Sequence, residues 1–439
     1  MVGGHQGVKY LPVLLTQQRC IGWLQHSTLL AWSESYHGGP HFSAVSFSPG
    51  SRHKEAVYRI LGFISQMRQV SVSRKHLDYL DGLRASAALV VVLHHTWLQA
   101  GLPTYIFGHD AVGLFIVISG FCLTLPIITA GGILPSGALS FFKRRARRIL
   151  PPYYLAMILS LVLIWFFLGQ QPQGYYDESF DVNFEGIFTH LFLIHDIFIS
   201  TATQINGPFW SIAVEWRIYF LFPVFVLLFR HWGALKTLIL AFITSLILSF
   251  ILLHTSVNMD THGVSPQYIA LFTMGMFAAM IVYTDQGYFA MMYIRTPWHI
   301  LVILLGLILI VHGFVPLWHG NIVPHYISDY VVGLWSASLL IAASQPKTLL
   351  NTGFSWKPLV FIGTFAYSIY LLHFSLLRLF WQYLLLPFNL STWTTFALLI
   401  IIVVPIIIGL GYLFFLIAER PFLSQKQKKK INSSLQQSI

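Results

Sequence analysis

Long apolar stretches recur along the chain and alternate with short polar segments. A helix that crosses a membrane needs about 20 predominantly apolar residues. The pattern therefore predicts an all-α fold, a polytopic transmembrane helix bundle of about ten spans. We place these spans at residues 85–101, 110–130, 150–168, 208–229, 235–253, 267–283, 298–315, 326–344, 359–380 and 394–417. The shorter apolar stretch 186–199 has the length of a re-entrant or interfacial helix rather than a full crossing.

The distribution of basic residues predicts an orientation for this bundle. Lys and Arg accumulate in the cytoplasmic loops of membrane proteins. The predicted outer segments, 102–109, 169–207, 254–266, 316–325 and 381–393, contain neither. The opposite side holds the lysines of the C-terminal tail together with Arg74, Lys75, Lys143, Arg144, Arg145, Arg147, Arg148, Arg230, Lys236, Arg295, Lys347, Lys357 and Arg420. We expect both termini of the bundle to be cytoplasmic and the protein to lie in the plasma (inner) membrane.

Composition agrees with a lipid environment and excludes several other classes of protein. Of 439 residues, 56% are hydrophobic and 9% are charged, whereas soluble domains average about 25% charged residues. The net charge of +11 is not gathered on a polar surface of the kind that binds nucleic acid. Two cysteines, Cys20 and Cys122, stand far apart, which argues against a disulfide framework and a cysteine-based metal site.

Both ends of the chain differ from the apolar region between them. Residues 1–75 contain no clear span and no signal-peptide pattern. We interpret them as a poorly defined N-terminal extension, which is either disordered or part of an over-extended reading frame whose natural start is Met67. Residues 76–422 form the membrane domain, and residues 423–439 form a basic cytoplasmic tail that lies near anionic lipid headgroups.

Two ionisable residues of the first span lie on one helix face. Arg84 and His95 are eleven residues apart, which is three helical turns plus about 20° and a rise of about 16 Å. Arg84 then lies at the cytoplasmic end and His95 in the outer half, while His94 points about 100° away. Ionisable groups inside a membrane mark a functional site by default. The alternatives are that Arg84 reaches lipid phosphates and that His95 is a hydrogen-bonded packing residue.

Two further stretches combine small or basic residues with a predicted helix. Ser119 and Gly120 lie in mid-helix, where small residues allow another helix to approach closely. No acid–base partner lies near Ser119 in sequence to make it a nucleophile. The stretch FFKRRARRILPPYY, 141–154, is typical of a basic loop before a helix. Its charges either mark topology or form a phosphate site, in which Arg145 and Arg148 share a helix face.

Polar residues also occur in two later spans. Glu215 lies about 10 Å below the predicted outer surface, at a depth comparable to that of His95. Its carboxylate either orients an imidazole or binds a sugar hydroxyl, or it belongs to an internal ion pair that holds the bundle together. Trp210 is an interfacial anchor or a stacking platform for a sugar ring. His373 lies in a polar seam of the stretch 361–380, for which packing between helices is the simpler explanation.

The remaining outer histidines show no metal-ligand spacing. We therefore expect no metal site and treat these histidines as surface residues. They are His109, His190, His195, His254, His262, His319 and His325.

Six of these stretches, in this order, resemble the acyltransferase-3 family of multi-pass membrane O-acyltransferases. They are YLDGLRASAALVVVLHH, AVGLFIVISGF, FFKRRARRILPPYY, GPFWSIAVEWRIYFLFP, FIGTFAYSIYLLHF and AERPF. The ordered set, with ten residues between an arginine and a histidine, carries the resemblance, which runs from about Leu77 to Phe422. Members of the family transfer acetyl, succinyl and other acyl groups to O-antigens, peptidoglycan, glucans, Nod factors and macrolides.

The resemblance implies roles for individual residues. The histidine that ends the first motif is thought to be essential for acyl transfer in the family, which implies His95 as the catalytic histidine, because it alone keeps the spacing from Arg84. The pair of arginines after the second span corresponds to Arg145 and Arg148. The other matching motif positions are Ser119, Gly120, Phe121, Trp210, Ser211 and Glu215.

Two features depart from the family pattern. Gly113 stands where many members carry a polar residue, and Ile116 replaces the second Phe of a Phe pair, so the lining of the acceptor side stays open. The hydrolase-like domain that some members carry at the C-terminus is not found in this sequence. The resemblance then implies action alone or with a separate extracytoplasmic partner.

The resemblance and the buried ionisable residues together predict a membrane O-acyltransferase. It would move an acyl group, most often acetyl in the family, from cytoplasmic acyl-CoA to a hydroxyl of a carbohydrate or glycolipid acceptor. The predicted catalytic residues are His95 and Glu215, and the predicted donor-phosphate residues are Arg84, Arg145 and Arg148. The predicted pocket residues are Ser119, Trp210, Ser211 and His373. We expect no permanently bound cofactor, because acyl-CoA is a substrate.

Two other classes of protein compete with this interpretation. Buried Arg, Glu and His also fit a transporter or permease for a small or sugar-linked solute. Transporters usually show repeated halves with interrupted helices, and the sequence contains no such repeat. A purely structural membrane subunit would not need the clustering of ionisable residues.

Overall fold

The structure is a computed structural model that describes residues 77–102, 107–169, 181–259, 262–284, 287–314 and 325–423. These residues fold as helices joined by loops, with no strand among them, which confirms the all-α prediction. The predicted N-terminal extension and all but the first residue of the predicted tail lie outside the described residues.

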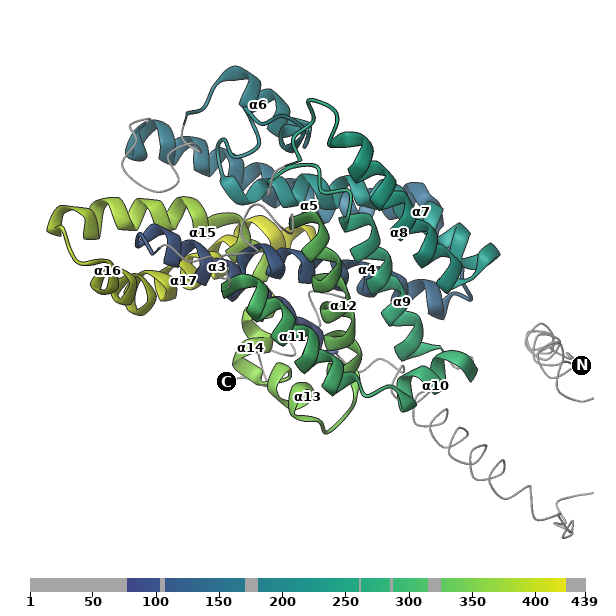
Figure 1. The fold of residues 1–439 in the computed structure, drawn as a ribbon. Coiled ribbons are helices and arrows are strands. Elements are labelled where there is room, and N and C mark those ends of the chain that lie inside the picture. The colour runs from purple at the N-terminus through teal and green to yellow at the C-terminus, as the bar shows by residue number, and fades with distance from the viewer. Residues whose placement is uncertain are drawn as a thin grey trace, which may run out of the picture. The chain divides into compact units, whose positions relative to one another are not determined.

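The described helices form one bundle (Figure 1). The first are α3 (Asp78–Gln99), α4 (Gly108–Thr129), α5 (Gly137–Leu163), α6 (Phe184–Leu191), α7 (Trp210–Trp232), α8 (Ala234–Leu252) and α9 (Tyr268–Tyr283). They are followed by α10 (Gly287–Arg295), α11 (Trp298–Phe314), α12 (His325–Ser344), α13 (Leu349–Phe354), α14 (Lys357–Gly363), α15 (Ala366–Phe380), α16 (Thr392–Leu398) and α17 (Val404–Phe414). Wider π-helical turns extend α5, α15 and α17 and join α16 to α17.

Seven segments of the described chain are long and apolar enough to cross a membrane. They are Gly108–Thr129, Gly137–Leu168, Gly207–Trp232, Ala234–Leu252, Ile327–Ser344, Ala366–Phe388 and Thr392–Phe422. An eighth results if α9 and the bent-off α10 are counted together. The chain is therefore a membrane protein, while the count of ten spans and the cytoplasmic termini stay predictions.

The three predicted spans outside this set coincide with helices α3, α9 and α11. Helix α3 contains Arg84 and two histidines, which lower its apolarity. Helix α9 has 16 residues, fewer than the about 20 that a straight crossing of the hydrocarbon core needs. Helix α11 runs to Phe314, the last described residue before the gap at 315–324. The ambiguous stretch 186–199 contains only the eight-residue helix α6 and a single 3₁₀ turn, so it does not form a spanning helix.

The basic stretch 141–154 is helical, which corrects the prediction of a loop. It lies inside α5, which begins at Gly137 and continues through both prolines. Hydropathy reports which residues suit lipid, whereas Lys and Arg are good helix formers. The helix therefore extends beyond its apolar part, and its arginines are held on a rigid element.

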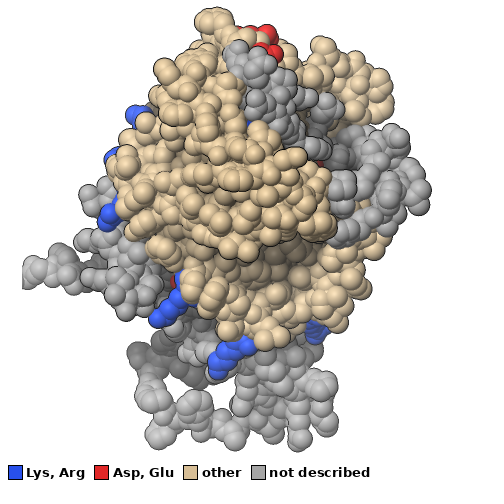
Figure 2. Space-filling model, turned by 90° about the vertical axis from the view of Figure 1, so that its left-hand side faces the viewer, with Lys and Arg blue, Asp and Glu red and all other residues tan. Residues whose placement is uncertain are grey.

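One broad face of the molecule has a centre without charged side chains. Figure 2 shows that the centre of this face carries no Lys, Arg, Asp or Glu, and that basic side chains lie toward its edges. Large apolar side chains are exposed on the described chain, including Phe166 at 76% and Ile401 at 70%. Soluble monomers rarely expose large apolar patches, so this surface suits contact with lipid.

Helices α4 and α9 cross closely at two glycines. A Cβ atom at Gly120 would lie 2.0 Å from the carbonyl oxygen of Phe272, and one at Gly275 would lie 2.0 Å from the carbonyl oxygen of Val117. Small residues permit this approach, because helix association in lipid depends on van der Waals packing. The predicted close approach at Gly120 is thus confirmed, and the partner is α9.

We expect Gly275→Ala to lower the stability of the bundle by about 1–3 kcal/mol, because the new methyl group forces two backbones apart. Thermal unfolding in detergent measures this as a lower Tm. Gly409→Ala in α17 is the matched control, since a Cβ atom there would meet no heavy atom within 4 Å. Equal melting of the two variants would contradict the close crossing.

Candidate active site

A cavity of about 300 Å³ lies between α3, α4, α5, α7 and α15. The structure brings six of the nine residues predicted for the site together around it. They are Arg84, Ser119, Arg145, Arg148, Ser211 and Glu215. The other three, His95, Trp210 and His373, do not line this cavity. The predicted face of the first helix is preserved, because α3 runs without a break from Asp78 to Gln99.

Three guanidinium groups line one part of the cavity. Arg84 donates to Asp81 at 2.5 Å and to the sulfur of Cys122 at 3.0 Å. The Nε atom of Arg145 is buried and has no hydrogen-bond partner in the part of the chain that the structure describes. Buried N–H donors usually have a partner. The arrangement therefore offers an unused donor and three positive charges to an anion.

A hydrogen-bonded chain of three side chains lies beside these arginines. The hydroxyls of Ser119 and Tyr219 are 2.8 Å apart, and the Tyr219 hydroxyl donates to a carboxylate oxygen of Glu215 at 2.5 Å. Ser119 thus has the acid–base neighbour that its sequence surroundings lack. The expectation that Glu215 orients an imidazole differs from this arrangement, in which its carboxylate accepts from a tyrosine.

The imidazole of His95 faces a second imidazole. Its Nδ1 atom lies 2.9 Å from the carbonyl oxygen of Val91 and 3.2 Å from Nε2 of His373. The ring is half-buried and meets the edge of Phe374, with ring centroids 5.5 Å apart. His373 is fully buried, so it is a neighbour of His95 rather than a lining residue of the cavity.

Tyr370 connects the cavity with the two imidazoles. Its side chain lines the cavity, and its hydroxyl lies 2.6 Å from the Ser211 hydroxyl. Its carbonyl oxygen lies 2.7 Å from Nδ1 of His373. A change in the position of α15 would therefore affect both places at once.

Trp210 is a packing residue in this structure and not an open platform. Its side chain is 4% exposed and stacks on the ring of His109, with centroids 5.6 Å apart. His109 in turn forms an ion pair with Asp329 at 3.1 Å, and Gln267 donates to the same carboxylate at 2.7 Å. His109 is buried and pairs with Asp329 of α12, so the prediction that it is a surface residue is wrong.

His190 and His195 are also buried, which corrects the prediction that they lie on the surface. Their rings stack with centroids 3.7 Å apart. Burial lowers the pKa of His190 to about 4, so both rings pack as neutral groups at physiological pH. The ring of His190 also faces that of Phe209, with centroids 6.3 Å apart, so this segment packs onto the main core.

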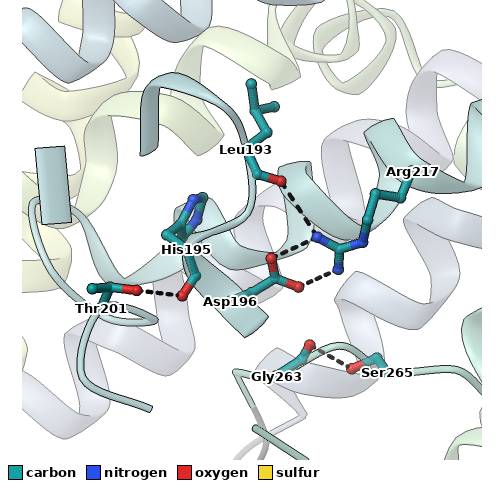
Figure 3. A network of polar contacts seen from close by, with 7 residues as sticks. All are labelled: Leu193, His195, Asp196, Thr201, Arg217, Gly263 and Ser265. Atoms are coloured by element: carbon teal, nitrogen blue, oxygen red, sulfur yellow. Dashed lines mark hydrogen bonds and ion pairs between the residues drawn. The ribbon is translucent and has the colours of Figure 1, made fainter. Parts of the chain in front are cut away.

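An ion pair fastens this loop to α7. Figure 3 shows the guanidinium of Arg217 directed at the carboxylate of Asp196. One of its two bonds to that carboxylate is 2.7 Å long, and a third donor bond reaches the carbonyl oxygen of Leu193 at 3.3 Å. Burial raises the pKa of Asp196, while Arg217 opposes this rise. The pair fixes the loop beside the helix that carries Glu215.

We expect Arg217→Met to destabilise the protein by about 3–5 kcal/mol, because it leaves the carboxylate of Asp196 buried and unpaired. The double variant Asp196→Asn/Arg217→Met should recover much of this loss. Thermal unfolding of both single variants and the double variant measures the coupling. Additive effects would show that the pair does not fasten the loop.

Sequence reasoning missed several polar residues around the site. They are Asp81, Cys122, Tyr219 and Glu419, of which the last three line the cavity. The aspartate stands one helical turn before an arginine, which is a detectable pairing signal. Tyr219 and Glu419 lie within stretches that carry the family resemblance, but no single-helix pattern indicated their partners.

The comparison with known families agrees with this geometry. Residues 77–412 match the acyltransferase domain family, acyltransferase family 3. The match covers well over half of the chain, and the chain belongs to this family.

Several bacterial proteins named as O-acetyltransferases are similar to this chain. The chain is 25% identical over 334 residues to the peptidoglycan O-acetyltransferase OatA of Listeria monocytogenes, covering 71% of this chain and 51% of that protein. Identity is 25% over 344 residues to the putative peptidoglycan O-acetyltransferase YrhL of Bacillus subtilis, with coverage of 70% and 49%. It is 26% over 326 residues to the O-acetyltransferase OatA of Staphylococcus aureus, with coverage of 70% and 51%. The chain spans about half the length of these curated relatives.

Proposed function

We propose that this chain is a membrane O-acyltransferase that moves an acetyl group from acetyl-CoA, supplied from the cytoplasm, to a sugar hydroxyl at the other side of the plasma membrane. One observation carries the proposal: three arginines line one cavity, and α3, which carries Arg84, also carries His95. The rise of an α-helix places these two residues about 16 Å apart along α3. That distance suits a donor with a charged end and a reactive end.

The arginines are the donor-binding residues in this proposal. Arginine binds phosphate through two parallel N–H donors, and the unused buried donor of Arg145 is available for such a contact. The pantetheine arm of CoA is long, on the order of 15–20 Å, which is comparable to the helical rise between Arg84 and His95. The arm would follow the face of α3 past Ser211 and Tyr370.

His95 is the general base of the proposed reaction. It takes the proton of the acceptor hydroxyl, and the oxygen forms a bond to the thioester carbonyl carbon. The carbon–sulfur bond then breaks, and the thiolate of CoA receives the proton from His95. Base, acid and proton are thereby restored, and no external reactant is needed. Polar groups in a site that excludes water stabilise the developing oxyanion.

The acceptor is proposed by analogy with the relatives. Two of them are named as peptidoglycan O-acetyltransferases, which favours a carbohydrate polymer or its lipid-linked precursor as the acceptor. A separate extracytoplasmic partner that completes the transfer is part of this proposal.

Labelled acetyl-CoA and purified protein in proteoliposomes test the proposal. With peptidoglycan fragments on the other side of the membrane, mass spectrometry should detect a labelled ester on the sugar. A permease would instead accumulate solute inside the vesicles and leave no ester. Absence of ester with every glycan and acyl donor tried, together with solute uptake, would overturn the proposal.

A further inference from the structure

Two backbone carbonyls determine which ring nitrogen of His95 and of His373 carries the proton. The carbonyl oxygen of Val91 lies 2.9 Å from Nδ1 of His95, and that of Tyr370 lies 2.7 Å from Nδ1 of His373. A carbonyl oxygen can only accept, so in neutral rings both Nδ1 atoms carry the proton. Each helix thus holds its own histidine in one tautomer.

The same assignment leaves both Nε2 atoms without a proton, but it gives them different roles. Nε2 of neutral His373 has a lone pair and lies 3.2 Å from the Nδ1–H group of His95, so it accepts a share of that proton. Nε2 of His95 is then the unprotonated nitrogen of its ring, which is the form that a general base requires. The reversed arrangement would set two lone pairs against two carbonyl oxygens.

From this geometry we infer that His373 is the positioning residue of the reaction and that it acts through the tautomer and orientation of His95. The inference rests on the proposed function of His95 as the base. In this arrangement a buried imidazole orients the general base, which is the role that a carboxylate has in many catalytic triads. The place expected for Glu215 is thereby reassigned, because that carboxylate accepts from Tyr219.

The pair also stabilises the positive charge that forms on the His95 ring during the reaction. When Nε2 of His95 takes the acceptor proton, the ring becomes an imidazolium whose Nδ1–H group points at the lone pair of His373. A hydrogen bond to the charged form favours that form. When the thiolate of CoA takes the proton back from Nε2, both rings return to their neutral tautomers.

Other titratable side chains near the His95–His373 pair could also contribute to the pH dependence of the reaction. His94 of α3 meets the edge of the His95 ring, with centroids 5.1 Å apart. The ring of Tyr370 on α15 lies 5.7 Å from that of His373, and His262, in the segment before α9, also acts on His95 electrostatically. None of these three neighbours is a carboxylate, so His373 is the group to vary.

Two amide variants separate the nitrogens of His373. In His373→Asn the amide nitrogen can replace Nδ1 and keep the bond to the Tyr370 carbonyl, but no acceptor reaches His95. In His373→Gln the amide oxygen can replace Nε2 and keep the acceptor. We expect kcat to fall about 10–100-fold in His373→Asn and to be largely retained in His373→Gln, with KM for both substrates little changed. The acid limb of kcat should move to lower pH in His373→Asn, because the imidazolium loses its acceptor.

Each outcome decides the inference. Equal kcat values in the two variants, or an acid limb that stays or moves to higher pH in His373→Asn, would overturn it. His373→Leu, compared with His373→Gln for elution profile and Tm, identifies losses that come from misfolding. An active His95→Ala variant would remove the proposed base itself, whereas an inactive His95→Ala with fully active His373→Asn would remove only the role of His373.

Discussion

His95→Ala should lower kcat for acyl transfer by about 10³-fold or more, while the protein inserts and purifies as before. The reason is that general-base catalysis contributes about 10²–10⁴-fold, and an alanine leaves no group to take the acceptor proton. The His95 ring is half-buried, so its removal costs little packing. Ester formation from labelled acetyl-CoA, followed by mass spectrometry, measures the loss.

His94→Ala is the matched control for this experiment. It removes the adjacent imidazole, which packs against Gly108 at the start of α4, and it changes the same kind of side chain in the same helix. We expect it to keep kcat within about tenfold of the unmodified protein, because only His95 shares the helix face of Arg84. Wild-type rates in His95→Ala, or equal losses in the two variants, would contradict the assignment.

Relations within one helix could be predicted from the sequence. Arg84 and His95 share a face because a helix has a fixed turn per residue, and α3 is continuous over both. The same argument holds for Arg145 and Arg148, which both line the cavity. Gly120 signalled a close crossing because a missing side chain allows two backbones to approach.

Relations between helices could not be predicted in this way. The contact of His95 with His373 joins residues 278 positions apart, and that of Ser119 with Tyr219 joins residues 100 positions apart. Such contacts depend on how one helix is rotated against another, and the apolar pattern of a lipid-facing helix hardly constrains that rotation. This is why the sequence alone predicts Glu215, and not His373, as the partner of the base.

The histidines predicted to lie on the surface show a second limit of sequence patterns. His109, His190 and His195 lie in the predicted outer segments 102–109 and 169–207, where single-sequence reasoning expects solvent. Each is buried instead by a partner from a distant segment or by the other imidazole. Hydropathy describes the preference of a residue, whereas burial depends on how loops fold over helix ends.

Arg145→Ala/Arg148→Ala should raise KM for acetyl-CoA by about 10²-fold or more and leave KM for the acceptor nearly unchanged. Hydrogen bonds to charged groups contribute about 1.5–3 kcal/mol each, and both side chains line the cavity at its basic part. The prediction follows from placing the phosphates of the donor there. Initial rates at varied donor and fixed acceptor concentrations, and the reverse, separate the two constants.

Arg144→Ala/Arg147→Ala removes the same two charges from the same helix and is the control. Both of these side chains are exposed, and Arg144 donates only to the carbonyl oxygen of Pro135 at 3.2 Å among its described contacts. A long-range effect of positive charge on an anionic donor would appear in both double variants and would weaken with salt. A bidentate site would appear in Arg145→Ala/Arg148→Ala alone. An equal rise of donor KM in the two pairs would therefore remove the phosphate site from the mechanism and leave the arginines of α5 as markers of orientation.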